Sequence, residues 1–180
     1  MARSEVVKTQ PGLRRPTQAS LHEVIVSSAS AALTLQRDDG SMPAGHNGPY
    51  YDPETPVRNT AHWLITFSRA YEISGAERFL DAVRGAAGYL NGKEARPHGA
   101  TFWHRTNPAK DRCNGLIGQA WTIEALAVGA RALGMVDLTD LGEQVFMLHP
   151  FDEGEGLWNR VETDGTVLGF DATLNHQIWF

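Results

Sequence analysis

Tryptophan recurs in this chain at a fixed interval. Trp63, Trp121 and Trp179 are separated by 58 residues and then by 58 again. Each tryptophan ends a similar short motif, NTAHW, LIGQAW or NHQIW. Each motif lies near the start of an expected helix that follows a long polar connection. Self-similarity at a fixed period indicates one supersecondary unit per period, with each unit packed on its neighbours. The expected unit is a long loop, an inner helix, a short turn and an outer helix.

The spacing of apolar residues predicts a helix on each side of the short turns. The predicted helices cover residues 19–37, 59–75, 76–92, 114–134 and 138–148, and a sixth begins at residue 174. Glycine ends three of them, at Gly75, Gly92 and Gly134. Segment 114–134 is apolar on nearly every side, which is typical of a helix surrounded by others. The connections over 38–59, 93–112 and 149–173 are expected to be loops.

These units predict an all-α fold. Helical repeats form either open solenoids, whose periods are usually about 34 to 47 residues, or a closed toroid of six helical hairpins with longer units. The tight turns SGAE and GMVD lie opposite the long loops, and this asymmetry favours the toroid. We therefore expect a fold of the (α/α)6 toroid type in residues 18–180, with about three hairpins present and the long loops on one rim. Residues 1–17 are expected to form a polar tail.

Charge and motif content exclude several classes of function. The net charge is −5 and no run of Lys or Arg exceeds two residues, so no nucleic acid partner is expected. No apolar run approaches the roughly 20 residues of a membrane span, and no signal peptide is evident, so a cytoplasmic location is the default expectation. Cys113 is the single cysteine, which excludes an internal disulfide. Neither metal-ligand spacing nor a nucleotide-binding glycine motif is present, so we expect no metal and no cofactor.

Carboxylates in the long loops suggest sugar chemistry. Asp52 and Glu54 flank Pro53, and an extended backbone would send both side chains to the same side. Asp111 and Asp171 hold the equivalent place in the next two units. Glycosidic cleavage uses two carboxyl groups, about 5 Å apart for retention and about 6.5–9.5 Å apart for inversion. These four acids are the candidate catalytic residues; the alternative is that acids at these places simply favour helix N-termini through the helix dipole.

Two loops contain a similar three-residue motif, Trp103-His104-Arg105 in one and Trp158-Asn159-Arg160 in the other. Tryptophan can stack on a sugar, and arginine can bind a carboxylate or phosphate through two hydrogen bonds. The alternative is that the tryptophans pack in the interior and the arginines are solvated. A pair of histidines could instead abstract a proton from a sugar carbon, as an epimerase requires. The candidate substrate-binding residues are His46, Tyr50, Tyr51, Trp103, His104, Arg105, Trp158 and His176.

Three segments carry a resemblance to a known family. The words DGSMPAGHNGPYYDPETPVRNTAHWL, NGLIGQAWTIEAL and NHQIWF resemble the Agl cluster protein AglQ family, within the six-hairpin glycosidase class of (α/α)6 toroids. The likeness covers about residues 20–180. Because about three units are present rather than six, we expect the chain to correspond to an N-terminal half. A half toroid would expose faces that favour self-association.

The resemblance implies a protein that acts on an oligosaccharide or surface glycan. The first hypothesis is glycoside hydrolase-like chemistry by Asp52 and Glu54, with Asp111 and Asp171 as partners or sugar-binding groups. The second is a non-catalytic glycan-binding or glycan-assembly scaffold protein. The third is a sugar epimerase that uses histidines such as His46 or His176. The expected ligand is a glycan in all three cases.

Overall fold

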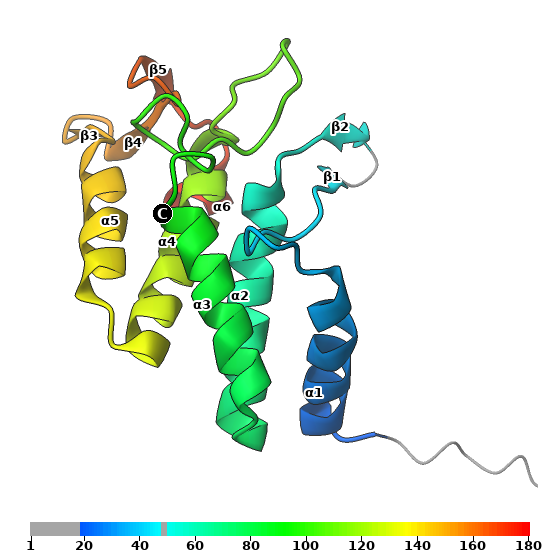
Figure 1. Ribbon diagram of the computed structural model, residues 1–180. Helices are drawn as coiled ribbons and strands as arrows, with labels where there is room; N and C mark the ends of the chain where they lie inside the picture. The colour runs from blue at the N-terminus through cyan, green and yellow to red at the C-terminus, as the bar shows by residue number, and fades with distance from the viewer. Residues whose placement is uncertain (1–18, 48–49) are drawn as a thin grey trace, which may run out of the picture.

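The computed structural model describes residues 19–47 and 50–180 (Figure 1). The predicted polar tail over residues 1–17 lies outside the described residues. The helix predictions are confirmed, with ends that shift by a few residues. The elements in chain order are α1 (Leu21–Ala32), the 3-10 turn η1 (Leu33–Leu35), β1 (His46–Asn47), β2 (Asp52–Pro53), α2 (Pro56–Ser74), α3 (Glu77–Asn91), α4 (Gly115–Leu133), α5 (Val136–Met147), β3 (Phe151–Asp152), β4 (Leu157–Val161), β5 (Val167–Phe170) and α6 (Leu174–Trp179).

Local sequence explains where the first helices begin and end. The Ser20 hydroxyl accepts a hydrogen bond from the Glu23 amide at 3.2 Å, and the Glu23 carboxylate accepts one from the Ser20 amide at 2.7 Å. This reciprocal capping box fixes the start of α1. Thr55 caps α2 and Pro56 occupies its first position, where the missing N–H costs nothing. Gly75 ends α2 in the left-handed conformation, with φ of 64°.

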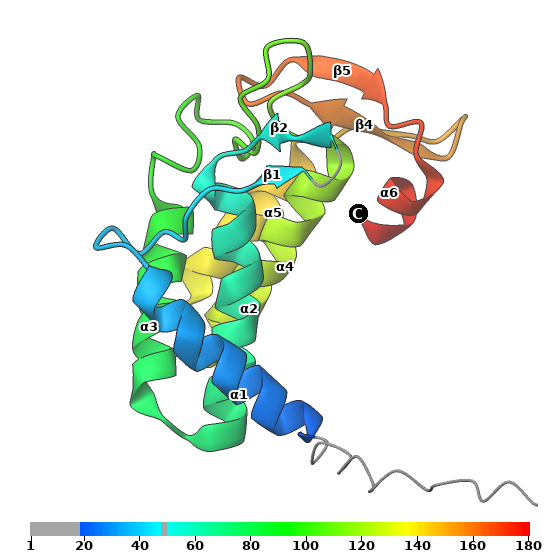
Figure 2. The ribbon, with the colours of Figure 1, turned by 90° about the vertical axis from the view of Figure 1, so that its right-hand side faces the viewer.

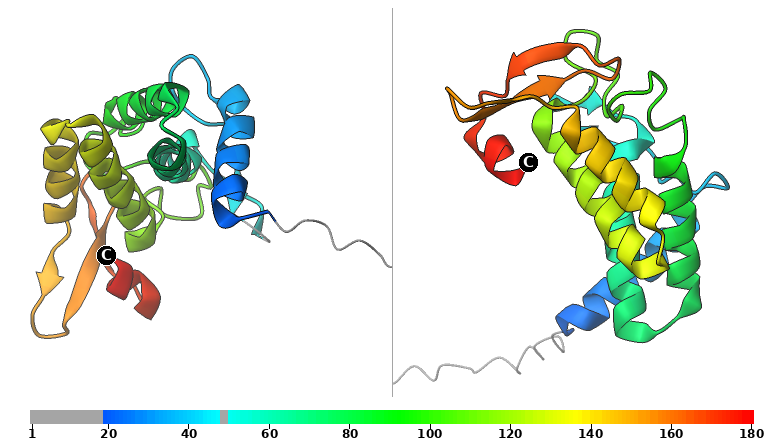
Figure 3. Two further views of the ribbon diagram at one scale, coloured as in Figure 1. Left: turned by 90° about the horizontal axis from the view of Figure 1, so that it is seen from below. Right: turned by 90° about the vertical axis from the view of Figure 1, so that its left-hand side faces the viewer.

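Helices α2 and α4 form the centre of the bundle (Figure 3). Helix α2 packs against α1, α3 and α4, and α4 packs against α2, α3 and α5. Small residues allow this close approach: a Cβ at Gly129 of α4 would lie 3.4 Å from the Leu64 side chain of α2. The buried core consists mainly of aliphatic and phenylalanine side chains, among them Leu64, Phe67, Phe79, Leu90, Leu126 and Leu138, each with 0% exposure.

The long connections gather at one end of the bundle (Figure 1). The short α2–α3 and α4–α5 turns lie at the opposite end. Helix α6 returns beside α4, below β4 and β5 (Figure 2). Polar loop residues from distant parts of the sequence therefore meet near the first turn of α4.

The prediction of an all-α fold is wrong, because the segment predicted as a loop over 149–173 contains β-sheet. Strands β3, β4 and β5 form a three-stranded antiparallel sheet in which Arg160 pairs with Gly169. The turn of the second hairpin contains Asp164 and Gly165, and Gly165 has a φ of 92°. An Asp-Gly pair between apolar runs is a strong hairpin signal, because glycine adopts positive φ without steric cost. Strands β1 and β2 form a second, two-stranded antiparallel sheet in the first loop.

The first long connection is attached to the helices before it reaches β1. The Met42 amide donates to the Thr60 hydroxyl of α2 at 2.9 Å, and Met42 is 1% exposed. The Asn59 side chain donates to the Pro43 carbonyl at 2.7 Å. Gly40 has a φ of 82° and packs directly on the backbone of Gly85 in α3. The connection is therefore a packed part of the fold.

We expect Gly40→Ala to destabilise the protein by about 2 kcal/mol or more, because the added Cβ overlaps backbone and the φ is strained for alanine. That Cβ would lie 2.1 Å from the Gly85 carbonyl oxygen. The matched control is Gly88→Ala, at an exposed position of α3 where a Cβ meets nothing within 4 Å. This change should be neutral or stabilising by about 0.5–1 kcal/mol. Thermal unfolding followed by circular dichroism measures both, and equal effects would contradict the packing described.

Candidate functional site

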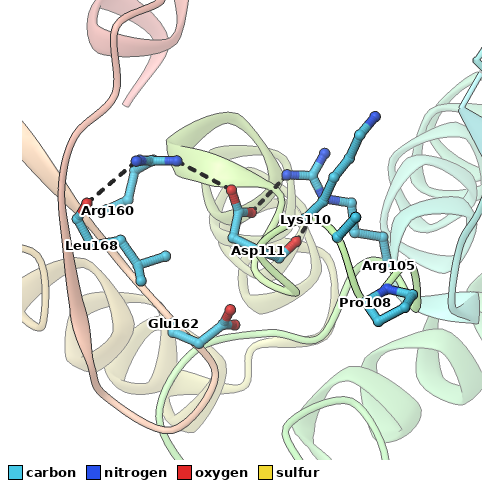
Figure 4. A pocket seen from close by; sticks show the side chains of 8 residues that line it. Arg105, Pro108, Lys110, Asp111, Arg160, Glu162 and Leu168 are labelled. Carbon is cyan, nitrogen blue, oxygen red and sulfur yellow. Dashed lines mark hydrogen bonds and ion pairs between the residues drawn. The ribbon is translucent and has the colours of Figure 1, made fainter.

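An open groove lies between the loop over 105–111 and the sheet of β4 and β5 (Figure 4). Its volume is about 540 Å³. A smaller pocket of about 200 Å³ shares Arg105, Asp111 and Arg160 with it and extends toward α6. We call the two together the Asp111 groove. Its lining residues are Arg105, Pro108, Ala109, Lys110, Asp111, Asn114, Gly115, Arg160, Glu162, Leu168, Asp171, Thr173 and His176.

Asp111 lies between two guanidinium groups in the middle of the groove (Figure 4). Its Oδ1 atom accepts a hydrogen bond from Arg105 Nη2 at 2.8 Å, and its Oδ2 atom accepts one from Arg160 Nη1 at 3.2 Å. The Gly115 amide also donates to Oδ1, at 3.0 Å. Burial raises the pKa of Asp111, but the Gly115 amide and the Arg105 charge outweigh it, so the pKa lies below the usual value. Asp111 is therefore a stable carboxylate at neutral pH.

Backbone contacts fix both arginines in place. Arg105 Nε donates to the Asp111 carbonyl at 2.6 Å, and the Trp103 indole donates to the Arg105 carbonyl at 2.8 Å. On the other side, Arg160 Nη2 donates to the Leu168 carbonyl of β5 at 3.3 Å. Each guanidinium is thus held by backbone oxygens as well as by Asp111, and its orientation is defined before any ligand binds.

Asp171 approaches the same helix end from a different loop. Its Oδ2 atom accepts the Leu116 amide at 3.1 Å and His176 Nδ1 at 3.0 Å, while Oδ1 accepts the Thr173 amide at 3.1 Å. Burial raises the pKa of Asp171, but these hydrogen bonds, led by the one from His176, outweigh it and hold the pKa below the usual value. Asp171 is also a carboxylate at neutral pH.

Asp111 and Asp171 therefore share the N-terminus of α4, where backbone N–H groups have no partner within the helix. The helix dipole favours negative charge there. Gly115 is required at this point because its φ is 60° and an added Cβ would lie 2.6 Å from Asp171 Oδ2. Two of the four predicted catalytic acids thus have the helix-terminus role that was the alternative explanation for them.

Of the other two predicted acids, Asp52 lies in β2 and Glu54 directly follows it, and neither is part of the groove lining. Asp52 accepts hydrogen bonds from Lys110 and, at 2.8 Å, from the Asn107 side chain. The hydrogen bonds from Lys110 and then Asn107 lower the pKa of Asp52. Glu54 accepts a hydrogen bond from Arg58 of α2 at 2.6 Å. Asp52 therefore holds the loop that carries Lys110, whereas Glu54 is paired with the first turn of α2. Neither acid lines the groove with Asp111 and Asp171.

Three predicted binding residues lie on the exposed side of the first loop. Tyr50 and Tyr51 are 72% and 75% exposed. Tyr51 stacks on His46 with ring centroids 5.0 Å apart, and Lys110 lies over the Tyr50 ring at 5.4 Å. None of the three aromatic rings lines the Asp111 groove. Trp103 is half-buried and lines an adjoining pocket of about 320 Å³ together with Lys110.

The structure places His104 and Trp158 among packed side chains. His104 is 1% exposed, and its Nε2 atom lies 3.1 Å from the Thr122 hydroxyl of α4. Burial lowers the pKa of His104 to about 3, so the ring is neutral. Trp158 contacts aromatic rings on several sides, with centroid distances of 5.0, 4.8 and 5.5 Å to Phe146, Phe151 and Phe180. Arg105 and His176, by contrast, do line the groove.

Arg160, Lys110 and Glu162 line the groove and are not among the candidates predicted from sequence. The sequence could have pointed to Arg160, because Arg160 ends the Trp158-Asn159-Arg160 motif just as Arg105 ends the Trp103-His104-Arg105 motif. The structure brings these two equivalent arginines to one carboxylate. Lys110 and Glu162 had no such signal, because their place in the groove depends on how the loop over 105–111 packs against the sheet.

Among residues 19–47 and 50–180, no group of three or more His, Cys, Asp or Glu side chains is arranged to hold a metal ion. Among the helices described there, none is both long enough and apolar enough to cross a membrane.

We expect low pH to reduce the contribution of Asp111 to the stability of the fold. A carboxyl group with a lowered pKa in the folded state stabilises the fold above its unfolded pKa of about 3.9, and that contribution is lost as the pH falls through the folded pKa. Asp111→Asn should lower the free energy of unfolding by roughly 2–4 kcal/mol at pH 7, because two guanidiniums lose their counter-charge. The difference in free energy of unfolding between the variant and the wild type should be smaller at pH 3. Denaturant unfolding at both pH values measures it.

Asp81→Asn is the control, because Asp81 is 69% exposed in a surface pair with Arg84. Such pairs contribute about 0–1 kcal/mol. The assignment of Asp111 as an ionised, part-buried carboxylate that pairs with two arginines would be contradicted by either of two results. One is a loss of unfolding free energy in Asp111→Asn that is the same at pH 7 and pH 3, and the other is a loss equal to that of the control.

The sequence of the chain is similar to that of an archaeal glycosylation protein. The chain is 60% identical over 161 residues to archaeal glycosylation protein Q of Haloferax volcanii, and the match covers 89% of this chain and 43% of that protein. The chain therefore spans less than half the length of this relative. No family model matches the chain, and no solved structure matches it significantly. The predicted resemblance to the AglQ family is confirmed as similarity of sequence to archaeal glycosylation protein Q.

Proposed function

We propose that this chain serves in glycan assembly and binds an acidic glycan in the Asp111 groove. The name of the related archaeal protein supports the involvement with glycosylation. The observation that carries the binding site is the pair of guanidiniums, Arg105 and Arg160, held on one carboxylate at the floor of an open groove. Such pre-oriented donors bind oxygen-rich ligands with a smaller loss of side-chain conformational entropy.

The guanidinium donors in the groove favour a ligand with a carboxylate or phosphate group. The lining contains three cationic side chains, Arg105, Lys110 and Arg160, and three acids, Asp111, Glu162 and Asp171. Within the described residues, the Arg105 Nη1 group makes no hydrogen bond to protein, so its N–H donors are available to a ligand. Guanidinium groups form paired hydrogen bonds with carboxylates and phosphates. The Trp103 ring in the adjoining pocket offers a surface on which a neighbouring sugar can stack.

The protonation states favour binding over hydrolysis by the four predicted acids. A glycosidase requires one carboxyl group that is protonated at the working pH, and enzymes raise its pKa for that purpose. The pKa values of Asp52, Asp111 and Asp171 are instead lowered, and Glu54 is paired with Arg58. Each acid already accepts hydrogen bonds from cationic or amide donors. We therefore propose a glycan-binding role and assign no general acid among these four.

We expect the chain to bind trigalacturonic acid, and to bind the neutral counterpart galactotriose more weakly by about tenfold or more. Arg160→Gln should weaken binding of the acidic trisaccharide by about tenfold, which corresponds to roughly 1.4 kcal/mol. Isothermal titration calorimetry measures all three affinities. The trisaccharide should be recovered intact afterwards.

Arg131→Gln is the matched control, because Arg131 lies on α4 with its side chain 65% exposed, paired with Glu72 at 3.0 Å. It should bind trigalacturonic acid like the wild type. Circular dichroism establishes that both variants fold. The proposed site is wrong if the wild type binds neither saccharide, or if the Arg160 and Arg131 variants bind equally well.

A further inference from the structure

A histidine and a carboxylate form a pair at the inner end of the Asp111 groove. His176 Nδ1 lies 3.0 Å from Asp171 Oδ2, and both residues line the smaller pocket together with Arg105 and Arg160. The Asp171 side chain is 8% exposed, while that of His176 is 26% exposed. The carboxylate is therefore more buried than the imidazole, and both side chains line the pocket.

The hydrogen bonds around Asp171 determine which ring nitrogen carries the proton. Amides of Leu116 and Thr173 donate to the two carboxylate oxygens, so Asp171 acts only as an acceptor. His176 Nδ1 must then donate its proton to Asp171. In the neutral ring the other nitrogen, Nε2, has a free lone pair. It makes no hydrogen bond to any of the described residues.

We propose that His176, oriented by Asp171, accepts a hydrogen bond at Nε2 from a hydroxyl group of the glycan bound in the groove. This inference rests on the proposed function, because the bound glycan supplies the hydroxyl group. The sugar hydroxyl donates to the Nε2 lone pair, and no covalent bond is formed or broken. Asp171 remains ionised and holds the Nδ1 proton, and the guanidiniums of Arg105 and Arg160 line the same pocket. Asp171 is then a positioning residue, and His176 is the group that contacts the glycan.

Other histidines near the loops lack this arrangement. His104 and His149 are buried, at 1% and 2% exposure. His149 Nδ1 lies 3.0 Å from the Asn159 carbonyl, away from any carboxylate. His46 stacks on Tyr51 outside the groove. Within the described residues, His176 is the histidine that both contacts a buried carboxylate and lines the groove.

A purely structural role would have the same pair tie α6 to the start of α4, so the test must report on Nε2 itself. Asp171→Asn suits this purpose, because the Leu116 amide and His176 Nδ1 both contact Oδ2, and an asparagine with its oxygen at that place can keep both hydrogen bonds. The variant removes the negative charge beside the ring, which weakens Nε2 as an acceptor. Asp140→Asn, at an exposed position on α5, is the control.

The measurement is the rate of carbethoxylation by diethyl pyrocarbonate at pH 8, followed for each histidine by mass spectrometry. His176 should react faster than the exposed His22, and Asp171→Asn should slow His176 by roughly an order of magnitude, because the ring loses the negative charge beside it. Asp140→Asn should have no effect. Long-range nitrogen NMR of the wild type provides a variant-free check, with a protonated Nδ1 and a bare Nε2 expected. A His176 rate no higher than that of His22, unchanged in Asp171→Asn, or a protonated Nε2 would overturn the proposal.

The same reaction with trigalacturonic acid present separates this inference from the proposed function. Protection of His176, with His22 unaffected, supports both. Calorimetric binding of the saccharide without protection of His176 would overturn this inference alone. Absence of saccharide binding would overturn the proposed function and the inference with it.

Discussion

The arrangement of the loops depends on how the N-terminus of α4 is satisfied. Its first amides are bound by two carboxylates from different connections, Asp111 through the Gly115 amide and Asp171 through the Leu116 amide. A buried helix end needs such partners, because an unpaired N–H group costs about 1–3 kcal/mol. Once the two carboxylates are placed there, they fix the groups that bind to them. Arg105 and Arg160 are held by Asp111, and His176 is held by Asp171.

This arrangement explains why acids and arginines line the groove together. The carboxylates keep their charge because amides and guanidiniums stabilise it, and the guanidiniums are in turn held in defined orientations. The result is a rigid polar surface at the end of a helical bundle, with an apolar core below it. A rigid site of this kind suits the recognition of sugars, whose many hydroxyl groups need oriented donors and acceptors. In this account the side chain that accepts a hydrogen bond from a sugar hydroxyl is His176 rather than a carboxyl group.

Much of the helical part could be predicted from the sequence, because helices have local signals. Apolar spacing predicted each helix, and glycine marked the ends at Gly75 and Gly134, both left-handed. The β-hairpin over 157–170 also had a local signal in Asp164-Gly165, which the expectation of repeated loops obscured. The family resemblance depended on the residues of three sequence segments rather than on the spacing of apolar residues, and it identified the relative correctly.

The site was harder to predict, because its contacts join distant segments. Asp111 and Arg160 are 49 residues apart, and Leu116 and Asp171 are 55 apart. Sequence alone supplied the residue types but not the pairing. It could not show that His104 would be buried beside Thr122 while Arg105, the next residue, would reach the groove. In an extended segment neighbouring side chains face opposite ways, so the direction of each depends on how the loop packs.

The most direct test of the account is a carbon-detected NMR titration of the side-chain carboxyl groups of Asp111 and Asp171 in the intact chain. The account predicts that both titrate below about 3.9, the ordinary value for aspartate. A pKa at or above that value for either residue would contradict the claim that the two ionised carboxylates hold the start of α4 and orient the groove.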